Sequence, residues 1–313
     1  MNAPLSPLAP LSELRVHLGA HKTASTHLQM TLYDARDALL AQGIDAIPQR
    51  DLRRAVGPLM DPRKPGGRRM GRALGAACLG ALAPARRGPG RLVLTEENLI
   101  GTSQWPLRRP PYWTAPFFLR PVRALSRIAA QGGGETHLFL AIRSFDEMLP
   151  AAYAQRLRLR PWPESFEAVA ARALARPPSW LPLVRLIRLT LPRATLSIWR
   201  HDDYRANSHA IREAICGAPL PRLPEPENPF GTRTPSAEAV AWAEALPKDL
   251  DLYGRKVQTG ERFRASVEAG EPRWDPFSAD QKARLRARFD ADVAAIEGKG
   301  LARLLRFNGG AAS

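Results

Sequence analysis

One stretch decides the fold of this chain: His17-Leu18-Gly19-Ala20-His21-Lys22-Thr23-Ala24-Ser25-Thr26. An apolar approach that includes Leu14 and Val16 precedes it, and apolar positions at helical spacing follow it. This order predicts a strand, a tight turn and a helix. A turn of this kind directs backbone N–H groups, a helix N-terminus and the side chain of Lys22 toward one point. That point suits an anion such as a phosphate or a sulfate.

The composition fits a large globular domain with a strong basic excess. The chain has 313 residues, of which 44% are hydrophobic, and a formal net charge of +16. We expect a flexible arm over residues 1–12 and a single α/β domain over residues 13–313. Arginine supplies most of the positive charge, and it suits bidentate contact with phosphate, sulfate or carboxylate. Two alternative explanations of the excess of arginine stay open. The side chains bind an anionic ligand, or the excess reflects a coding bias that also favours Ala, Gly and Pro.

The sequence gives no indication of a metal site or a membrane span. Cys78 and Cys216 lie in apolar, helix-like contexts, where small buried side chains are expected, and no Cys/His cluster has zinc spacing. The first residues lack the charged and apolar regions of a signal peptide, and no apolar run approaches the ~20 residues that span a bilayer. We therefore expect a cytoplasmic protein without a bound metal, for which peripheral contact with a membrane surface stays open.

Predicted strands alternate with predicted helices along the chain. Strands are expected at residues 15–18, 44–47, 91–95, 137–142 and 195–199, and helices at 23–42, 70–82, 121–131, 146–160, 164–176, 179–191 and 203–217. Residues 50–72 combine many arginines with Pro and Gly, which indicates a basic loop, and residues 248–277 lack a clear period. Helices at 236–246 and 278–296 belong to a C-terminal helical part over residues 235–297. The alternation predicts an α/β fold with a mostly parallel central sheet flanked by helices.

Sheets of this kind bind ligands at the carboxyl ends of their strands. Lys22, Glu96, Glu97 and Arg143 each follow the end of a predicted strand. The sequence therefore predicts one site that contains all four side chains.

The turn departs from the Walker A pattern, because Lys22 comes only three residues after Gly19. It resembles the 5′-phosphosulfate-binding loop of sulfotransferases that use 3′-phosphoadenosine 5′-phosphosulfate (PAPS), whose form is Gly-x-x-Lys-Thr-Gly-Thr-Thr. The likeness is strongest to bacterial members whose loop reads His-x-Gly-x-His-Lys-Thr-Gly-Thr-Thr and continues into Leu-Gln, as Leu28-Gln29 do here. Ala24 stands where the family usually has glycine, and its methyl group is expected to crowd the approach of backbone to phosphate.

Weaker likenesses extend over roughly residues 14–297. The stretch Thr95-Glu96-Glu97-Asn98-Leu99 is similar to the family's Ser-Ser-Glu-Asn-Leu. Arg143 followed by Tyr153-Ala154-Gln155 is similar to its 3′-phosphate signature, although Ala151 occupies the position of that signature's serine. One neutral hydrogen bond of about 1 kcal/mol is then missing. The resemblance implies a three-layer architecture like that of P-loop NTPases.

The resemblance implies direct in-line transfer of a sulfuryl group from PAPS to a hydroxyl acceptor, with a carbohydrate or glycolipid as one candidate. Lys22 would neutralise charge on the bridging oxygen as the bond to the leaving phosphate breaks. Glu97 is the first candidate for the base that takes the acceptor proton, ahead of Glu96 and His21. The scheme needs no divalent metal, and the arginines form no recognisable nucleic-acid-binding motif. The expected PAPS-binding residues are His21, Lys22, Thr23, Ala24, Ser25, Thr26 and Arg143.

Two other classes of function stay open. A P-loop kinase or NTPase would need a metal-binding aspartate after an apolar strand, whereas the predicted strands end in Glu96, Arg143 and Arg200. A non-catalytic relative that binds a nucleotide or an anionic glycan is the other class, because Ala24 and Ala151 both remove expected ligand contacts. Structural roles also stay open for the acids at a helix start, for His21 in the turn and for Arg143 as an ion-pair partner.

Overall fold

The computed structural model describes residues 11–60, 68–88, 90–108, 110–222 and 234–307. Within these ranges, six strands form one sheet in the order β2-β3-β1-β4-β5-β6, and every neighbouring pair is parallel. The strands are β1 Glu13–His17, β2 Ile44–Ala46, β3 Arg91–Thr95, β4 Glu135–Ile142, β5 Thr195–Arg200 and β6 Arg303–Leu304. The expected α/β fold with a parallel central sheet is confirmed, and β6 is a strand that the sequence pattern did not predict.

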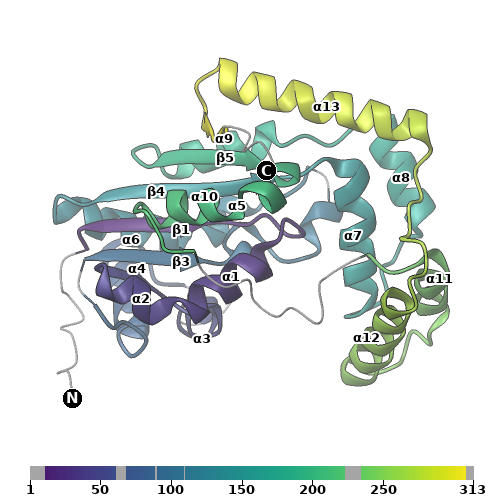
Figure 1. Cartoon of the computed structure of the whole chain (residues 1–313), viewed down its shortest axis with the longest axis horizontal. Helices are drawn as coiled ribbons and strands as arrows, with labels where there is room; N and C mark the ends of the chain where they lie inside the picture. The colour runs from purple at the N-terminus through teal and green to yellow at the C-terminus, as the bar shows by residue number, and fades with distance from the viewer. Residues whose placement is uncertain (1–10, 61–67, 89, 109, 223–233, 308–313) are drawn as a thin grey trace.

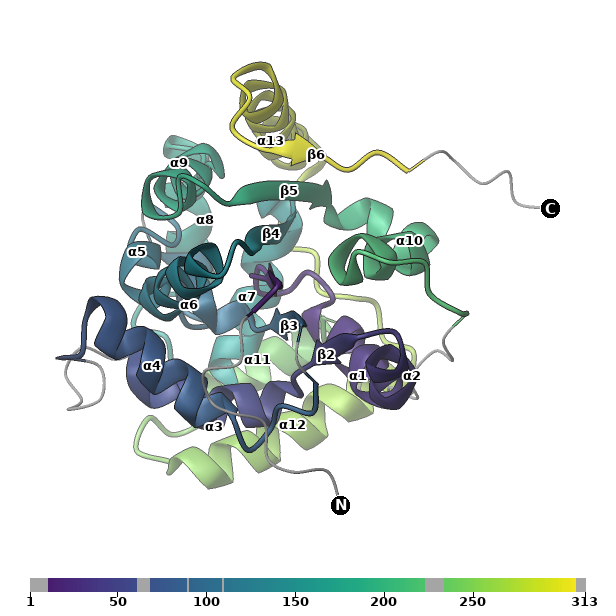
Figure 2. The same cartoon turned by 90° about the vertical axis from the view of Figure 1, so that its left-hand side faces the viewer.

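Helices cover both faces of the sheet, which gives three layers (Figures 1 and 2). On one face lie α3 Gln49–Met60, α4 Gly71–Leu82, α6 Arg120–Gln131 and α9 Leu181–Thr190, and on the other lie α1 Ser25–Asp34, α2 Arg36–Ala41 and α10 Tyr204–Cys216. Successive strand side chains point to opposite faces. Leu14 and Val16 accordingly join the larger core, whereas Val93 and Phe139 join a second core with Leu28.

Several further helices lie beyond the carboxyl ends of the strands or along the sheet edge (Figure 1). They are α5 Ala115–Phe118, α7 Phe145–Leu157, α8 Phe166–Ala175, α11 Ala237–Ala245, α12 Leu252–Glu268 and α13 Ala279–Gly298, with short 3-10 turns η2 Glu97–Ile100, η3 Trp105–Leu107 and η4 His201–Asp203. Helix α13 begins with a capping box between Ser278 and Gln281. The helices expected in the C-terminal part over residues 235–297 are therefore present, together with α12.

The expectation of a basic loop over residues 50–72 is wrong for residues 50–60, which belong to α3. The buried side chains Leu52, Val56 and Leu59 recur at helical spacing. The arginines between them and the Gly57-Pro58 pair conceal this period in the sequence. Residues 61–67 of the expected loop lie outside the described residues, and α4 begins at Gly71.

The expectation of irregular structure over residues 248–277 is also wrong, because α12 occupies Leu252–Glu268. Its buried face includes Arg255, Thr259 and Ser266, so a period of apolar residues is absent from the sequence. The two terminal nitrogens of the buried Arg255 guanidinium donate to the carbonyl oxygens of Ala243, Leu246 and Pro247 near the end of α11. A polar helix face is thus buried by hydrogen bonding to a neighbouring helix end.

The remaining expectations differ in smaller ways. Residues 1–10 of the expected N-terminal arm lie outside the described residues, and Leu11 is fully buried in the core. The predicted helix over residues 23–42 divides at Ala35 into α1 and α2. Cys78 and Cys216 are both free and buried, as expected. No helix in the described ranges has the combined length and hydropathy that crossing a bilayer needs.

Candidate functional site

The turn after β1 lies at the point where the order of the sheet changes direction. The chain leaves β1 toward β2, on the far side of β3, whereas β4 pairs with the other edge of β1. Backbone bonds from Leu18 N to Phe139 O (2.8 Å) and from Ala20 N to Ala141 O (3.1 Å) hold the turn against β4. Such switch points at the carboxyl ends of parallel strands are where α/β sheets bind ligands.

The predicted tight turn is confirmed and contains two residues with left-handed backbone. Lys22 has φ 62° and Ala24 has φ 64°, and α1 begins at Ser25 directly afterwards. Ala24 is the N-cap residue of α1, and its methyl group offers no hydrogen bond to the free N–H groups of the first turn. Those N–H groups are therefore left to a ligand or to water.

The hydroxyl groups of the turn point inward. Thr23 Oγ1 donates to Ala20 O at 2.6 Å, and Ser25 Oγ donates to the same carbonyl oxygen at 3.0 Å. Both side chains are buried, whereas Thr26 is exposed on the first turn of α1. Two hydroxyls bonded to one carbonyl stabilise the turn, and a ligand would have to compete for their protons.

His21 packs at the end of a row of stacked aromatic rings. Its Nδ1 lies 3.2 Å from the hydroxyl of Tyr112, and its Nε2 lies 3.2 Å from Asn98 Oδ1. The rings of His21 and Tyr112 stack at 5.9 Å, Tyr112 stacks on Trp180 at 5.9 Å, and Trp180 stacks on Phe145 at 5.2 Å. Both ring nitrogens of His21 thus have protein partners, which makes this side chain a support of the turn.

Arg143 follows the end of β4 and reaches back to the turn. Its Nη1 donates to the carbonyl oxygen of Lys22 at 2.8 Å, and its Nη2 donates to Glu147 at 2.8 Å. The indole of Trp180 donates to the carbonyl oxygen of Arg143 at 2.8 Å. These bonds fix the backbone and the guanidinium of Arg143 next to Lys22.

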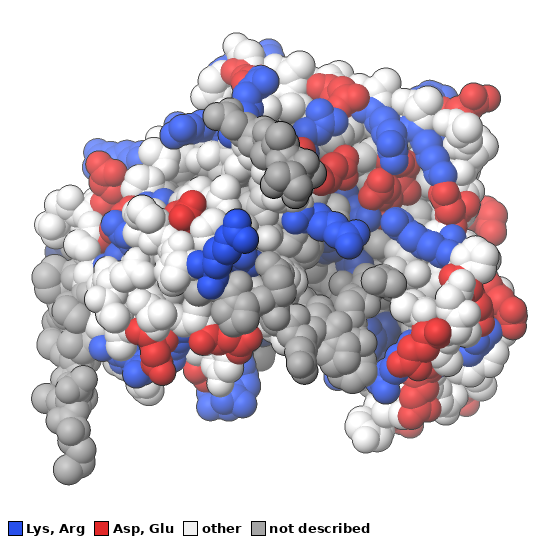
Figure 3. Space-filling view, viewed as in Figure 1, with Lys and Arg blue, Asp and Glu red and all other residues white. Residues whose placement is uncertain are grey.

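A cavity of about 720 Å³ opens beside the turn. In the space-filling view of this face, several basic side chains border the hollow near α7 and α12 (Figure 3). The residues that line the cavity come from the turn, from the ends of β4 and β5, from α10, from the segment before α11, and from the end of α12 and the residues after it: Lys22, Ala24, Arg143, His201, Arg205, Thr234, Val267, Gly270, Glu271 and Arg273. Four of these side chains are basic and one is acidic, so the cavity suits an anion with more than one charge.

The electrostatics of the cavity affect two titratable groups in its wall. Burial, together with the neighbouring charges of Arg143 and Arg158, lowers the pKa of Lys22 to about 8. Burial lowers the pKa of His201 to about 4, with Arg143 adding to the effect. His201 Nδ1 is buried without a hydrogen-bond partner among the described residues. A neutral imidazole and a partly desolvated ammonium therefore face the same space, and a bound anion would raise the pKa of both groups.

The two carboxylic acids among the candidate bases, Glu96 and Glu97, are not among the residues that line this cavity. A Cβ atom built on Gly19 would meet Glu97 Cβ at 2.7 Å, so glycine lets the acidic segment approach closely. Arg53 bonds Glu96 through Nε (2.6 Å) and Glu97 through Nη2 (2.8 Å), and Gln29 Nε2 bonds Glu97 at 2.9 Å.

Opposing influences set the charge of these two carboxyl groups. Burial and the neighbouring Glu97 raise the pKa of Glu96, against the effect of Arg53. Burial alone would raise the pKa of Glu97, but His21, Arg53 and Gln29 hold it below its usual value. Glu97 is therefore an ionised carboxylate, and it already accepts hydrogen bonds from its neighbours.

The structure brings only some of the predicted site residues to one cavity. Lys22, Ala24 and Arg143 line it, whereas His21, Thr23, Ser25 and Glu97 are not among its lining residues. In the expected 3′-phosphate signature, Ala151 is buried, and the hydroxyl of Tyr153 bonds Glu244 at 2.6 Å. The hydroxyl of Tyr153 thus donates its hydrogen bond to a side chain of α11.

Sequence reasoning did not select His201, Arg205 or Arg273 as site residues, although all three line the cavity. His201 directly follows the end of β5, so the rule that selected Arg143 could have found it. Arg273 lies about 250 residues from Lys22, between α12 and α13. No local sequence pattern predicts that it lines the same cavity.

No protein-family model matches the chain, and no curated protein sequence matches it.

Among the described residues, no group of three or more His, Cys, Asp or Glu side chains is placed to hold a metal ion.

Proposed function

We propose that this chain is a sulfotransferase that uses PAPS as donor. The observation that carries the proposal is the convergence of Lys22, Arg143, Arg205 and Arg273 on one cavity beside the left-handed turn after β1. The loop sequence that resembles the phosphosulfate-binding loop forms one wall of that cavity. A cavity of about 720 Å³ lies within the range of sites that bind nucleotide-sized ligands.

The charges support a donor with two anionic ends. Lys22 and the free N–H groups at the start of α1 are the groups proposed to bind the 5′-phosphosulfate. Arg143 is proposed to bind the 3′-phosphate, as the resemblance implies, and Arg205 and Arg273 add positive potential across the same space. Because the pKa of Lys22 is already lowered to about 8, binding of the anion raises it and draws a proton from solution above that pH.

The proposed step forms one bond and breaks one. The oxygen of the acceptor hydroxyl attacks the sulfur of PAPS, and the bond from sulfur to the bridging phosphate oxygen breaks. Lys22 stabilises the negative charge that develops on that oxygen. The acceptor proton passes to a carboxylate, for which Glu97 is the proposed base. The products are a sulfate ester, which a carbohydrate or glycolipid hydroxyl could form, and 3′,5′-phosphoadenosine.

One observation favours a second candidate, a domain that binds the nucleotide without transferring sulfate. Glu97 is held by Arg53 and Gln29 and does not line the cavity that Lys22 faces. A carboxylate held in this way would have to change partners before it could accept a proton from an acceptor. Measuring binding and transfer separately distinguishes the two candidates.

Isothermal titration calorimetry with 3′,5′-phosphoadenosine tests the binding step. Wild-type protein is expected to bind, Lys22→Ala to bind at least about tenfold more weakly because a charged hydrogen bond is lost, and Lys256→Ala, an exposed lysine on α12, to bind like wild type. Titrations above pH 8 in buffers of different ionisation enthalpy are expected to report proton uptake. Absence of binding by the wild type would refute both candidates.

Transfer of radiolabelled sulfate from PAPS to a panel of carbohydrate, glycolipid and phenolic hydroxyls tests the chemistry. The sulfotransferase proposal expects a labelled product, a strong loss of rate in Lys22→Ala, and a loss of rate with retained nucleotide binding in Glu97→Gln. Binding without any labelled product would favour the second candidate. Full activity of Glu97→Gln would remove Glu97 from the proposed mechanism.

A further inference from the structure

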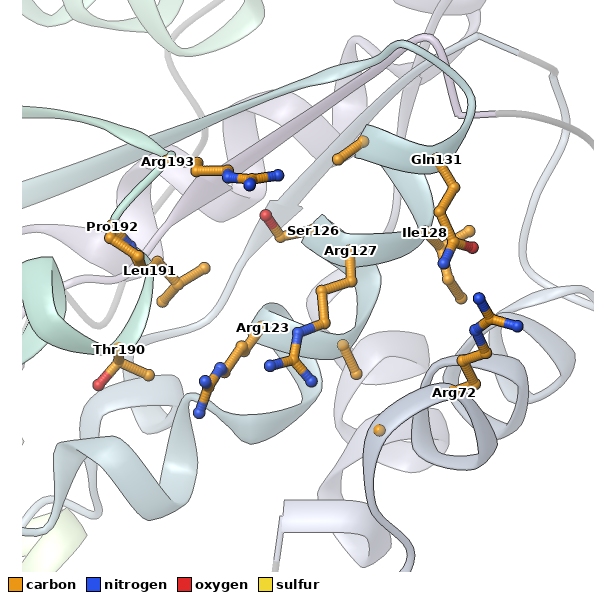
Figure 4. A pocket seen from close by; sticks show the side chains of 13 residues that line it. Arg72, Arg123, Ser126, Arg127, Ile128, Gln131, Thr190, Leu191, Pro192 and Arg193 are labelled. Carbon is orange, nitrogen blue, oxygen red and sulfur yellow. The ribbon is translucent and has the colours of Figure 1, made fainter.

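A second cavity lies on a different part of the fold. It has a volume of about 630 Å³, and the start of α4, α6 from Arg123 onward and the end of α9 surround it (Figure 4). Helix α6 ends shortly before β4 begins, and α9 ends shortly before β5 begins. The cavity therefore lies toward the amino ends of the strands, at the opposite edge from the turn, and the described residues that line it are all different from those of the first cavity.

The charged residues that line this cavity, as far as the described ranges show it, are all basic. Arg72, Arg123, Arg127 and Arg193 line it, and no Asp or Glu of the described ranges does. None of the four guanidinium groups forms an ion pair within the described part of the chain. Arg123 and Arg127 lie one helical turn apart on α6 (Figure 4), a spacing at which like charges destabilise a helix. An anionic partner would offset this repulsion.

Apolar side chains accompany the arginines. Ala124, Ile128 and Leu191 line the cavity. Two strongly exposed apolar side chains stand next to lining residues in sequence, Met70 before Gly71 (74% exposed) and Leu189 before Thr190 (77% exposed). The neighbours Arg68 and Arg69 are exposed as well. Exposed apolar side chains interleaved with cations are typical of protein surfaces that lie on anionic membranes.

We propose that this face docks on an anionic lipid bilayer, with the phosphate of a lipid headgroup in the cavity between Arg123, Arg127 and Arg193. Met70 and Leu189 then reach the boundary between headgroups and acyl chains, where their exposed apolar surface leaves water. A single-stranded nucleic acid fits less well, because the described part of the chain places no aromatic side chain in the cavity wall for base stacking. A glycan would leave Met70 and Leu189 in water. The inference does not depend on the proposed sulfotransferase activity.

Vesicle co-sedimentation tests the proposal at physiological ionic strength. One set of vesicles is phosphatidylcholine alone, and in the other a third of the lipid is phosphatidylglycerol. The wild type is expected to sediment with the anionic vesicles and to stay in solution with the neutral ones. Each basic side chain at such a surface strengthens partitioning roughly fivefold. The double variant Arg123→Gln/Arg127→Gln is therefore expected to bind anionic vesicles roughly 30-fold more weakly.

Matched variants separate this face from the general basic charge of the protein. Arg284→Gln/Arg303→Gln removes two exposed arginines from α13 and β6 and is expected to bind like the wild type. Met70→Ser/Leu189→Ser keeps the charge and is expected to weaken binding. Equal losses in the two arginine double variants, or no loss in the serine variant, would overturn the proposal.

Two further measurements complete the test. Millimolar inorganic phosphate is expected to leave vesicle binding in place, and its displacement of the protein would show a site for free phosphate instead of a membrane surface. Lys22→Ala is expected to sediment like the wild type, because Lys22 belongs to the other cavity. Loss of nucleotide binding and loss of membrane binding are thereby distinguishable, and failure of one proposal leaves the other standing.

Discussion

Replacing Lys22 by methionine is expected to stabilise the fold while it removes anion binding. Burial and the nearby arginines lower the pKa of Lys22 from 10.5 to about 8, so the folded protein holds this ammonium less favourably than the unfolded chain does. At 1.36 kcal/mol per pKa unit the difference corresponds to about 3 kcal/mol. Lys22 is partly exposed, and water at the cavity mouth screens part of this cost. We therefore expect Lys22→Met to raise the free energy of unfolding by about 2 kcal/mol at pH 7.

The sign of the pH dependence follows from the lowered pKa. Below about pH 8 Lys22 is charged in both states, and its cost to folding is fully present. Between this pH and 10.5 the unfolded chain binds more protons at Lys22 than the folded protein does, so the cost decreases as pH rises. The advantage of Lys22→Met is therefore expected to fall by more than half at a pH near 9.5. Lys22 lowers the pKa of His21 and of His201, but both groups titrate below this pH range in the folded protein, so they contribute little to the change in the difference.

Urea denaturation of the two proteins at both pH values measures this effect. Methionine, like lysine, has an unbranched side chain, so the left-handed backbone at position 22 is equally strained in the variant and in the wild type. This strain therefore cancels when the two unfolding free energies are compared. Lys256→Met on the exposed face of α12 is the control and is expected to change stability by less than ~0.5 kcal/mol. A destabilised Lys22→Met variant, or an advantage that does not shrink at high pH, would refute the account of Lys22 as an electrostatically strained cation.

Two further predictions concern the residues around the turn. Ala24→Gly is expected to stabilise the protein by about 0.5 kcal/mol, because relief of the left-handed backbone (~1–2 kcal/mol) outweighs the added entropy of the unfolded chain (~0.4–1 kcal/mol). The same change in the middle of α13, Ala287→Gly, is expected to cost about 1 kcal/mol, and urea denaturation showing the same sign for both would contradict this reasoning. Arg53→Met is expected to cost about 2 kcal/mol, since it leaves the buried carboxylate of Glu96 without its bidentate partner. The neighbouring exposed Arg54→Met should change the unfolding free energy by less than ~0.5 kcal/mol, and equal effects of the two would show that the pair does not stabilise the fold.

Local sequence determined the parts of this protein that depend on short-range physics. The apolar approach, the glycine and the helical period around residues 17–26 predicted the strand, turn and helix at the centre of the sheet, because each follows from neighbours in the chain. The strand-end rule predicted that Arg143 lies beside Lys22, since parallel strands bring their carboxyl ends to one edge. The amphipathic period of α3, by contrast, was hidden by arginines and by a Gly-Pro pair that usually ends a helix.

Tertiary structure alone decided the rest of the site. The short strand β6, the polar buried face of α12 and the approach of Arg273 to Lys22 all depend on segments far apart in the chain. The position of Glu97 also depends on distant segments. The sequence predicted that it lies in one site with Lys22, whereas its carboxylate accepts hydrogen bonds from Arg53 and Gln29. Residue types and spacing determine which side chains reach the carboxyl edge of a sheet. Contacts between distant elements then decide which of these side chains share one cavity. Local sequence patterns do not predict such contacts.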